Sequence, residues 1–167
     1  MTLTESSDFD IRYTTEEDIE SLRAWMASPE MLHWYPPSPG DELENFIRIW
    51  IGFSRYGASL TALYKDQPIG LFTLYLMPYK KVAHHCIFQM IIDSKHQRQG
   101  VGRSLVRNGM HHAKQQFRLE MLQAEIIDHS PIVPLLKSMG FELVTVQEGY
   151  VKEEGNYFPR ILMEASL

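Results

Sequence analysis

Residues 90–104 read MIIDSKHQRQGVGRS, and the interpretation of the whole chain starts from this stretch. It passes from an apolar strand end (Met90 to Ile92) through a polar loop to Gly100 and Gly102, where a helix is expected to begin. The first N–H groups of a helix lie at the positive end of its dipole, so such a turn binds phosphate. The glycines let an anion approach the backbone, and Arg98 and Arg103 add positive charge. The alternative, that the Gly-x-Gly pair only permits a tight bend, stays open at this point.

The surrounding residues argue against two other phosphate-binding motifs. A nucleotide P-loop requires Gly-Lys followed by Ser or Thr, and this loop has no such triplet. A dinucleotide-binding turn has a third glycine and opens a βαβ unit, whereas this loop follows several strand-like runs. A nucleotide-binding domain is therefore disfavoured.

Regular patterns extend in both directions from the loop. After it, apolar residues at helical spacing predict a helix to about Phe117, and residues 122–127 read as a strand. Before it, β-rich runs at 59–64, 69–77 and 82–92 predict three antiparallel strands with tight connections. A strand, a helix and a further strand imply a parallel pair joined by a right-handed crossover.

The two ends of the chain add helices and a hairpin. Towards the N-terminus, a capping box at Thr14 to Glu17 opens a helix over about 15–27, and Asp41 caps a second amphipathic helix. Towards the C-terminus, a short helix over 130–139 precedes a hairpin of strands 141–152 and 157–165. Because no repeat or low-complexity linker separates these segments, residues 1–167 are expected to form a single domain.

Composition excludes several classes of protein. The 167 residues are 44% apolar, which suits one domain, and the longest apolar stretch is far shorter than the ~20 residues that span a bilayer. The N-terminus is acidic and polar, unlike a secretory signal, so a cytoplasmic protein with no membrane partner is expected. The single cysteine, Cys86, excludes an intrachain disulfide and lies in an apolar run, so it is expected to be buried.

Charge is unevenly distributed along the chain. The net charge of -5 argues against a nucleic-acid partner. However, residues 94–119 contain no acid and six of the 16 cations: Lys95, Arg98, Arg103, Arg107, Lys114 and Arg118. This distribution suits an anionic cofactor beside a cationic or neutral acceptor, although a solvated basic helix face is the alternative.

The segment Met90-Ile91-Ile92, followed by Gln97-Arg98-Gln99-Gly100-Val101-Gly102, resembles the signature of the GNAT superfamily of N-acetyltransferases. The order of elements is similar too, with a first strand at about 9–13 and a Gly140-Phe141 pair like the one that ends a later helix in that family. The resemblance implies an α/β fold (an α+β mixed sheet), the GNAT-like acyl-CoA N-acyltransferase fold. It has about seven mostly antiparallel strands and about four helices.

The same resemblance implies the cosubstrate and its site. Acetyl-CoA would place its pantetheine arm where the strand ending at Ile92 splays from the strand at 122–127. Backbone N–H groups of the loop would hold the pyrophosphate. The implied cofactor-binding residues are Met90, Ile91, Ile92, Gln97, Arg98, Gln99, Gly100, Val101, Gly102, Arg103 and Ser104.

Candidate bases are the histidines on the strand that leads to the loop. The family often has a carboxylate there, but this chain has no acid between Val82 and Ile92. His84 and His85 are the candidates because imidazole titrates near neutrality, with His84 expected on the face of Cys86. The alternative is a pair of ordinary strand histidines.

The thiolate-protonating tyrosine usual in the family aligns with Leu136, which cannot donate a proton. Tyr150 on the final hairpin is the candidate replacement, with Tyr157 as a further possibility, and either could equally be a sheet aromatic. No metal site is expected, because His111 and His112 lack the spacing of a metal pair.

His33, Trp34 and Tyr35 are the candidate substrate-binding residues, because they lie in the loop that walls the acceptor site in similar proteins. Trp34 and Tyr35 could instead only hold the helices together. The expected function is transfer of an acetyl group from acetyl-CoA to a primary amine of an unidentified small molecule or peptide, by a monomer or homodimer. The alternative is a non-catalytic acyl-CoA-binding regulatory domain.

Overall fold

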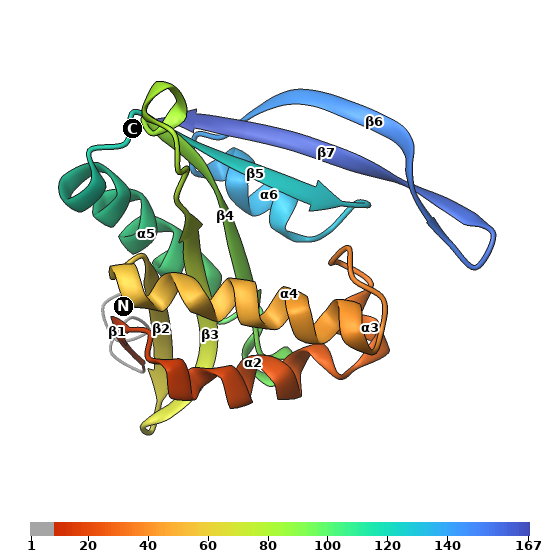
Figure 1. The fold of residues 1–167 in the computed structure, drawn as a ribbon, viewed down its shortest axis with the longest axis horizontal. Coiled ribbons are helices and arrows are strands. Elements are labelled where there is room, and N and C mark those ends of the chain that lie inside the picture. Colours follow the sequence, from red (N-terminus) through yellow and green to blue (C-terminus); the bar gives the residue numbers. More distant parts are fainter. Residues whose placement is uncertain (1–8) are drawn as a thin grey trace.

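A computed structural model describes residues 9–167, which form one seven-stranded mixed sheet between layers of helices (Figure 1). The strand order is β1-β2-β3-β4-β5-β7-β6, and every neighbouring pair is antiparallel except β4 and β5. The strands are β1 (Asp10–Tyr13), β2 (Ser59–Tyr64), β3 (Gln67–Tyr75), β4 (His85–Ile92), β5 (Met121–Ile127), β6 (Glu142–Glu153) and β7 (Asn156–Ser166). The α-helices are α2 (Ile19–Met26), α3 (Pro29–Leu32), α4 (Asp41–Gly52), α5 (Val101–Phe117) and α6 (Ile132–Ser138). The predicted mixed sheet is confirmed.

Five α-helices are present where about four were expected. The additional one is α3, in a segment that the sequence analysis did not assign to a helix. Proline is tolerated in the first turn of a helix because its missing N–H would have no partner there, and Pro29 occupies that position. The segment before β4 also differs, because residues 80–82 form a 3-10 turn and the strand begins only at His85. His84 therefore lies outside the strand on which it was expected.

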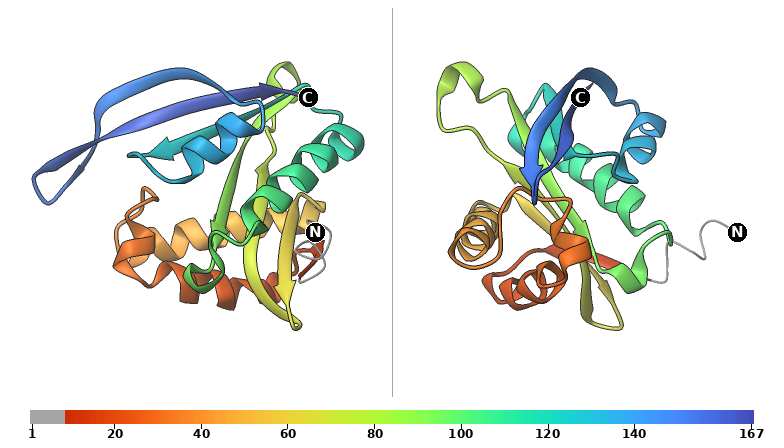
Figure 2. Two further views of the ribbon diagram at one scale, coloured as in Figure 1. Left: turned by 180° about the vertical axis from the view of Figure 1, so that it is seen from behind. Right: turned by 90° about the vertical axis from the view of Figure 1, so that its right-hand side faces the viewer.

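The helices pack in two layers on opposite faces of the sheet (Figure 2). Helices α2 and α4 cover one face of β1–β4, where Trp50, Leu71 and Ile91 belong to one core cluster. Helix α5 covers the opposite face, where Phe88 and Leu105 belong to a larger cluster. The α2/α4 layer does not extend over β5–β7, so this face of the C-terminal strands is left open (Figures 1 and 2).

Strand alternation assigns side chains of β4 and β5 to these two faces. Their parallel register pairs Ile87 with Gln123, so the two strands alternate in step. Ile91 packs on the α2/α4 side, which places Gln89 on the same face. Ala124 belongs to the cluster on the α5 side, so its neighbour Glu125 lies on the open α2/α4 face.

The parallel pairing of β4 with β5 is short. It comprises three residue pairs, His85 with Met121, Cys86 with Leu122 and Ile87 with Gln123. Beyond them β4 continues against β3 and β5 continues against β7. A gap therefore opens in the middle of the sheet.

We expect Gly109→Ala to destabilise the fold by about 1–3 kcal/mol, because overpacking a filled core forces neighbouring atoms to move. A methyl group at Gly109 would clash with the Phe72 ring, which is held by stacking on Phe88 at 4.8 Å. Gly52→Ala is the matched control, since a methyl group there meets no atom within 4 Å, and a gain of up to ~1 kcal/mol is expected. Urea unfolding measures both free energies. Equal stability of the two variants would contradict this packing.

Candidate functional site

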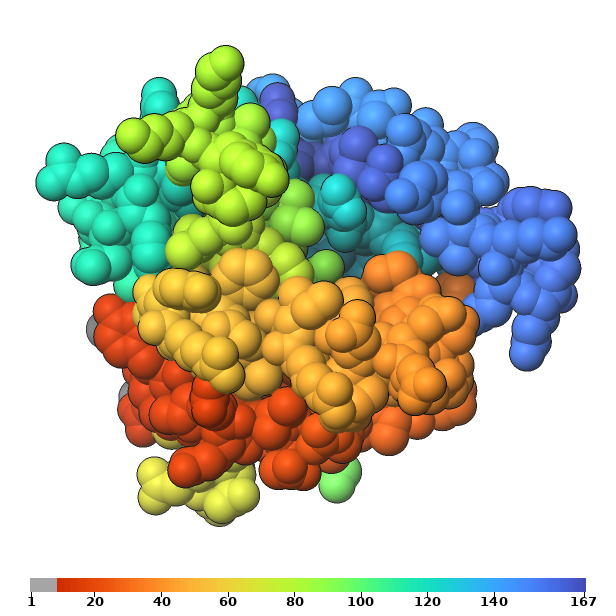
Figure 3. All heavy atoms as spheres, in the orientation of Figure 1, coloured from red at the N-terminus to blue at the C-terminus, as the bar shows by residue number. Residues whose placement is uncertain are grey.

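A cavity of about 460 Å³ occupies the gap where β4 and β5 separate. Figure 3 shows β5 recessed between the α3–α4 segment and the C-terminal hairpin. The cavity is lined from β4 by residues 88–92 and from β5 by residues 124–126, and it reaches the start of α5. The predicted splaying of the strand ending at Ile92 from the strand at 122–127 is therefore present.

The backbone of β4 faces this cavity with unpaired groups. Asp93 N donates to Ile69 O at 2.8 Å. Because every second residue of an antiparallel strand bonds to the same neighbour, Ile91 and Gln89 also bond to β3. The Phe88 C=O and the Met90 N–H and C=O therefore point into the gap, where β5 has already moved away, and of these the Met90 carbonyl accepts a hydrogen bond from the Tyr35 hydroxyl. Such groups require hydrogen-bonding partners, and an extended ligand can supply them.

The other end of the cavity is the N-terminus of α5. Gly100 precedes the helix with φ 86°, a conformation that favours glycine, and Arg98 also has a positive φ of 61°. Of the eleven predicted cofactor residues, eight line the cavity: Met90, Ile91, Ile92, Gln97, Arg98, Gly100, Gly102 and Arg103. Val101 is instead buried in the core, while Gln99 and Ser104 lie outside the lining. Free helical N–H groups and two arginines thus meet at one end of an apolar gap, an arrangement suited to a phosphate ester with a long arm.

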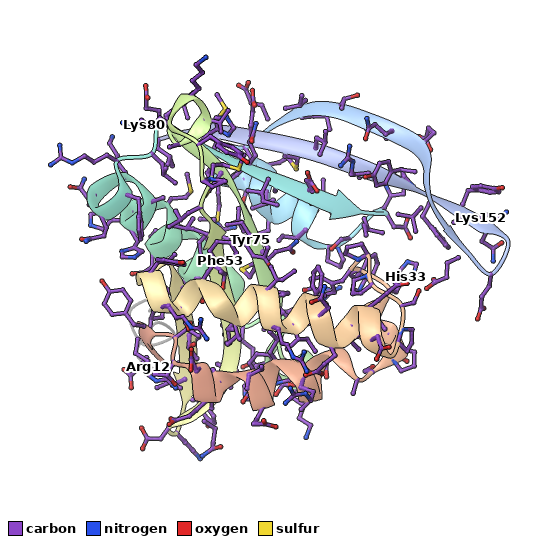
Figure 4. All side chains as sticks on the ribbon, viewed as in Figure 1. Arg12, His33, Phe53, Tyr75, Lys80 and Lys152 are labelled. Atoms are coloured by element: carbon purple, nitrogen blue, oxygen red, sulfur yellow. The ribbon has the colours of Figure 1, made fainter. Side chains whose placement is uncertain are left out.

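The segment His33–Tyr35, here called the bridging loop, spans the mouth of the gap. On the β5 side, His33 Nε2 lies 3.0 Å from Asp128 Oδ2, and Nδ1 lies 3.4 Å from Glu153 Oε1. On the β4 side, the Tyr35 hydroxyl donates to the Met90 carbonyl at 2.6 Å. In Figure 4, His33 lies between the helical layer and the C-terminal hairpin. Trp34 and Tyr35 line the cavity, whereas His33 does not, so the structure places His33 as an anchor of the loop.

Electrostatics favour the protonated form of this anchor. The hydrogen bond to Asp128 raises the pKa of His33 above 6.5, desolvation opposes the shift, and the bond to Glu153 adds to it. In the imidazolium form both ring nitrogens donate, one to each carboxylate. The hydrogen bond from His33 correspondingly lowers the pKa of Asp128, with a further contribution from the neighbouring His129. Burial raises the pKa of Tyr35, so this hydroxyl stays neutral.

Glu125 is the single carboxylate among the described residues that line the cavity. It lies on the open face, as Gln89 does, and its Oε1 is 3.6 Å from Arg160 Nη1 of β7. The sequence analysis missed both Gln89 and Glu125. The alternation of polar residues at 123 and 125 with apolar residues at 122, 124 and 126 was the available signal.

The predicted catalytic residues lie elsewhere. His84 is exposed in a turn, and its carbonyl accepts from Glu120 N at 2.7 Å. His85 is half-buried, with its ring edge-on to His84, and its Nδ1 has no partner within residues 9–167. Tyr150 is 55% exposed, and the Arg160 guanidinium lies 4.0 Å from the centre of its ring. None of these three residues lines the cavity.

The remaining features are structural. Leu136 is fully buried in the core, and Cys86 is fully buried as predicted. His112 Nε2 lies 2.6 Å from the Gly57 carbonyl. Within residues 9–167, no three acidic, histidine or cysteine side chains are grouped to hold a metal ion. No helix in the same range combines the length and hydropathy needed to cross a membrane.

Comparison with known proteins identifies related chains. The family model described as the acetyltransferase (GNAT) domain matches residues 11–162. The L-amino acid N-acetyltransferase AaaT of Escherichia coli (strain K12) is 23% identical over 155 residues, which cover 90% of this chain and 93% of the relative. A ribosomal-protein-alanine N-acetyltransferase from Brucella melitensis superposes with a TM-score of 0.81 at 23% identity, covering 95% of this chain and 99% of that one. The putative acetyltransferase yncA from Salmonella typhimurium, solved with its cofactor acetyl-CoA, gives a TM-score of 0.78 at 15% identity over 96% and 94% of the two chains.

The bridging loop generates a prediction about pH. Because the folded pKa of His33 is raised, its bridge is fully stable below the ordinary value of 6.5 and is lost as pH rises through the raised pKa. Asp128 sets the acid limit, since the bridge weakens as pH falls through its lowered pKa. In NMR titrations we expect His33 to lose its proton above pH 6.5, and Asp128→Asn to bring the His33 pKa down. Asp66→Asn, in the β2–β3 turn, is the control. An unaltered His33 titration in Asp128→Asn would contradict the bridge.

Proposed function

Because the chain belongs to the acetyltransferase (GNAT) family, we propose that it transfers the acetyl group of acetyl-CoA to a primary amine of a small molecule or peptide. One observation carries the proposal for this chain: the β4–β5 gap joins unpaired strand backbone to the N-terminus of α5. The thioester of acetyl-CoA supplies the acyl group, and its pyrophosphate and extended arm match the two ends of the cavity.

The backbone supplies most of the proposed cosubstrate contacts. N–H groups of Arg98, Gln99, Gly100, Gly102 and Arg103 bind the pyrophosphate at the positive end of α5. The backbone groups near Met90 to Ile92 that do not bond to β3 pair with the pantetheine arm, which takes the place of a strand beside β4. The Arg103 side chain is supported by a 2.9 Å hydrogen bond to Ser138 Oγ, which orients it at the loop.

We assign the general base to Glu125 rather than to His84 or His85. An alkylamine is protonated near neutral pH, and it must lose a proton before its nitrogen can attack a thioester. Glu125 is the carboxylate of the cavity lining, and it lies on the open face from which an amine reaches the gap. Thiols have a pKa of about 8.5, so the thiolate is a stable leaving group. No proton-donating side chain is therefore needed at the position of Leu136.

A non-catalytic acyl-CoA-binding regulatory domain is the second candidate. It is favoured by Leu136, which is fully buried where the family usually has a tyrosine, and by Gln89, an amide on the strand that often carries a carboxylate. Release of free CoA separates the two functions, because a regulatory domain binds acetyl-CoA but yields no thiol with any amine.

L-amino acids are the first amines to test as acceptors, because one relative is named as an L-amino acid N-acetyltransferase. Asp128, Glu153 and Glu125 make the open side acidic, which supports a cationic or neutral acceptor. The cytoplasmic location, the monomer or homodimer, and the lack of a nucleic-acid or membrane partner stay predictions.

Acetyl-CoA at about 100 times its Kd should raise the Tm by roughly 5–10 °C. Gly100→Glu should abolish this shift, because the side chain adds negative charge and blocks the amides that bind phosphate. The control is Gly155→Glu, which places the same side chain at another glycine of positive φ, in the distant β6–β7 turn. Differential scanning fluorimetry measures all three proteins. A normal shift in Gly100→Glu would place the cosubstrate elsewhere.

Glu125→Gln should lower kcat by about 10²-fold or more, the usual contribution of a general base, while the acetyl-CoA Tm shift remains. His84→Ala and His85→Ala should have smaller effects, because neither side chain lines the cavity. Thiol release with a saturating amine between about pH 6 and 9 measures the three rates. If the double histidine variant loses activity and Glu125→Gln does not, the base is a histidine.

A further inference from the structure

Arg160 is a cation held in place beside the proposed base. Its Nε donates to Gln147 Oε1 of β6 at 2.7 Å, and its guanidinium lies 4.0 Å from the centre of the Tyr150 ring. The Arg160 side chain is 20% exposed, so its position is largely set by these contacts. Neither terminal nitrogen donates a hydrogen bond to another of residues 9–167. An arginine that is held through Nε and by stacking on an aromatic ring keeps its two terminal nitrogens, with four N–H groups, as donors for a ligand.

The sheet register places this cation on the acceptor side. Along β7, Leu162 pairs with Glu125 and Arg160 pairs with Ile127, so the two charged side chains share the open face. They are separated by 3.6 Å, which is longer than the 2.7–2.9 Å of a charge-assisted hydrogen bond. Arg98 and Arg103 line the cavity at the α5 end, whereas Arg160 lies outside the lining and approaches it only through Glu125. Arg160 is therefore not needed for the phosphate groups.

We propose that Arg160 binds a carboxylate of the acceptor, while Glu125 takes the proton of the adjacent amine. The acceptor class is then a zwitterion whose amine and carboxylate stand close together, as in a free α-amino acid. The inference rests on the proposed acetyl transfer and adds the residue that determines acceptor specificity. The transfer balances in protons: the ammonium gives one proton to Glu125 and becomes a neutral amine, the N–C bond forms as the thioester C–S bond breaks, and the second proton lost from the nitrogen passes to the departing thiolate to give the free thiol.

Two features of the molecule support a carboxylate at this position. The open face also contains Asp128 and Glu153, which His33 already contacts, so Arg160 supplies a cation that those groups do not neutralise. Arginine presents its donors as a planar fork that matches a carboxylate in two hydrogen bonds. The joining of β6 to β7 through Gln147 uses Nε, and although Nη1 lies 3.6 Å from Glu125, neither terminal nitrogen makes a hydrogen bond within residues 9–167.

The test compares L-amino acids with their α-amides, which keep the amine and lack the charged carboxylate. We expect the wild-type protein to prefer the acids, and Arg160→Gln to lower the acid-to-amide ratio of kcat/KM by about 10- to 100-fold, the range for a lost hydrogen bond to a charged group. The loss should appear in the KM of the acids. Arg160→Lys should restore part of the ratio, since it keeps the charge but not the fork.

Arg48→Gln is the matched control, because Arg48 is 70% exposed on α4 and lies 3.7 Å from Glu44. Equal losses for acids and amides in Arg160→Gln would overturn the proposal and show a structural role. Wild-type activity on amides equal to that on acids would overturn it too. Thiol release with other amines but with no amino acid would overturn it while leaving acetyl transfer intact. No thiol release with any amine would instead refute the proposed function on which it rests.

Discussion

The separation of β4 from β5 after three parallel residue pairs is the constraint on which the rest of the structure depends. A sheet that stops pairing in its middle leaves backbone groups without strand partners. Burying such groups unpaired costs free energy, so the gap must stay open to solvent or hold a ligand. Each neighbouring element responds to this opening. Helix α5 begins at one end of the gap, and the bridging loop contacts both of its sides. The open face of β5 presents Glu125 into it.

Charge divides the gap into two functional sides. Arg98 and Arg103 stand with the helix dipole at the α5 end, whereas Glu125, Asp128 and Glu153 lie toward the open face. This distribution favours an anionic group of a ligand at one end and a cationic group at the other. His33 joins the acidic side to the helical layer, and the Tyr35 hydroxyl contacts the strand backbone that faces the gap. The two sides of the gap are thus linked through three consecutive residues.

Local patterns in the sequence were enough for the fold and for the glycine turn at the start of α5. The glycine loop at 100–102 lies at the start of α5, and eight of eleven proposed cofactor residues line the cavity. The candidates for proton transfer, His84, His85 and Tyr150, lie outside the cavity lining. His84 was assigned to a strand by its apolar neighbours, but a 3-10 turn and a tight turn precede β4, so its side chain is exposed. Periodicity does not show where a strand begins, because the turn residues here are themselves apolar or amphipathic.

The sequence by itself determined the order of elements, the mixed sheet and the glycine turn that opens α5. These depend on backbone geometry and on apolar spacing along short segments, which neighbouring residues encode. Only the tertiary structure decided which side chains meet across the gap. Glu125 and Arg160, and likewise His33, Asp128 and Glu153, come from separate elements, and their contacts depend on the register of β5 with β7 and on the length of the C-terminal hairpin. Such distances are set by the packing of the whole sheet, so no local pattern contains them.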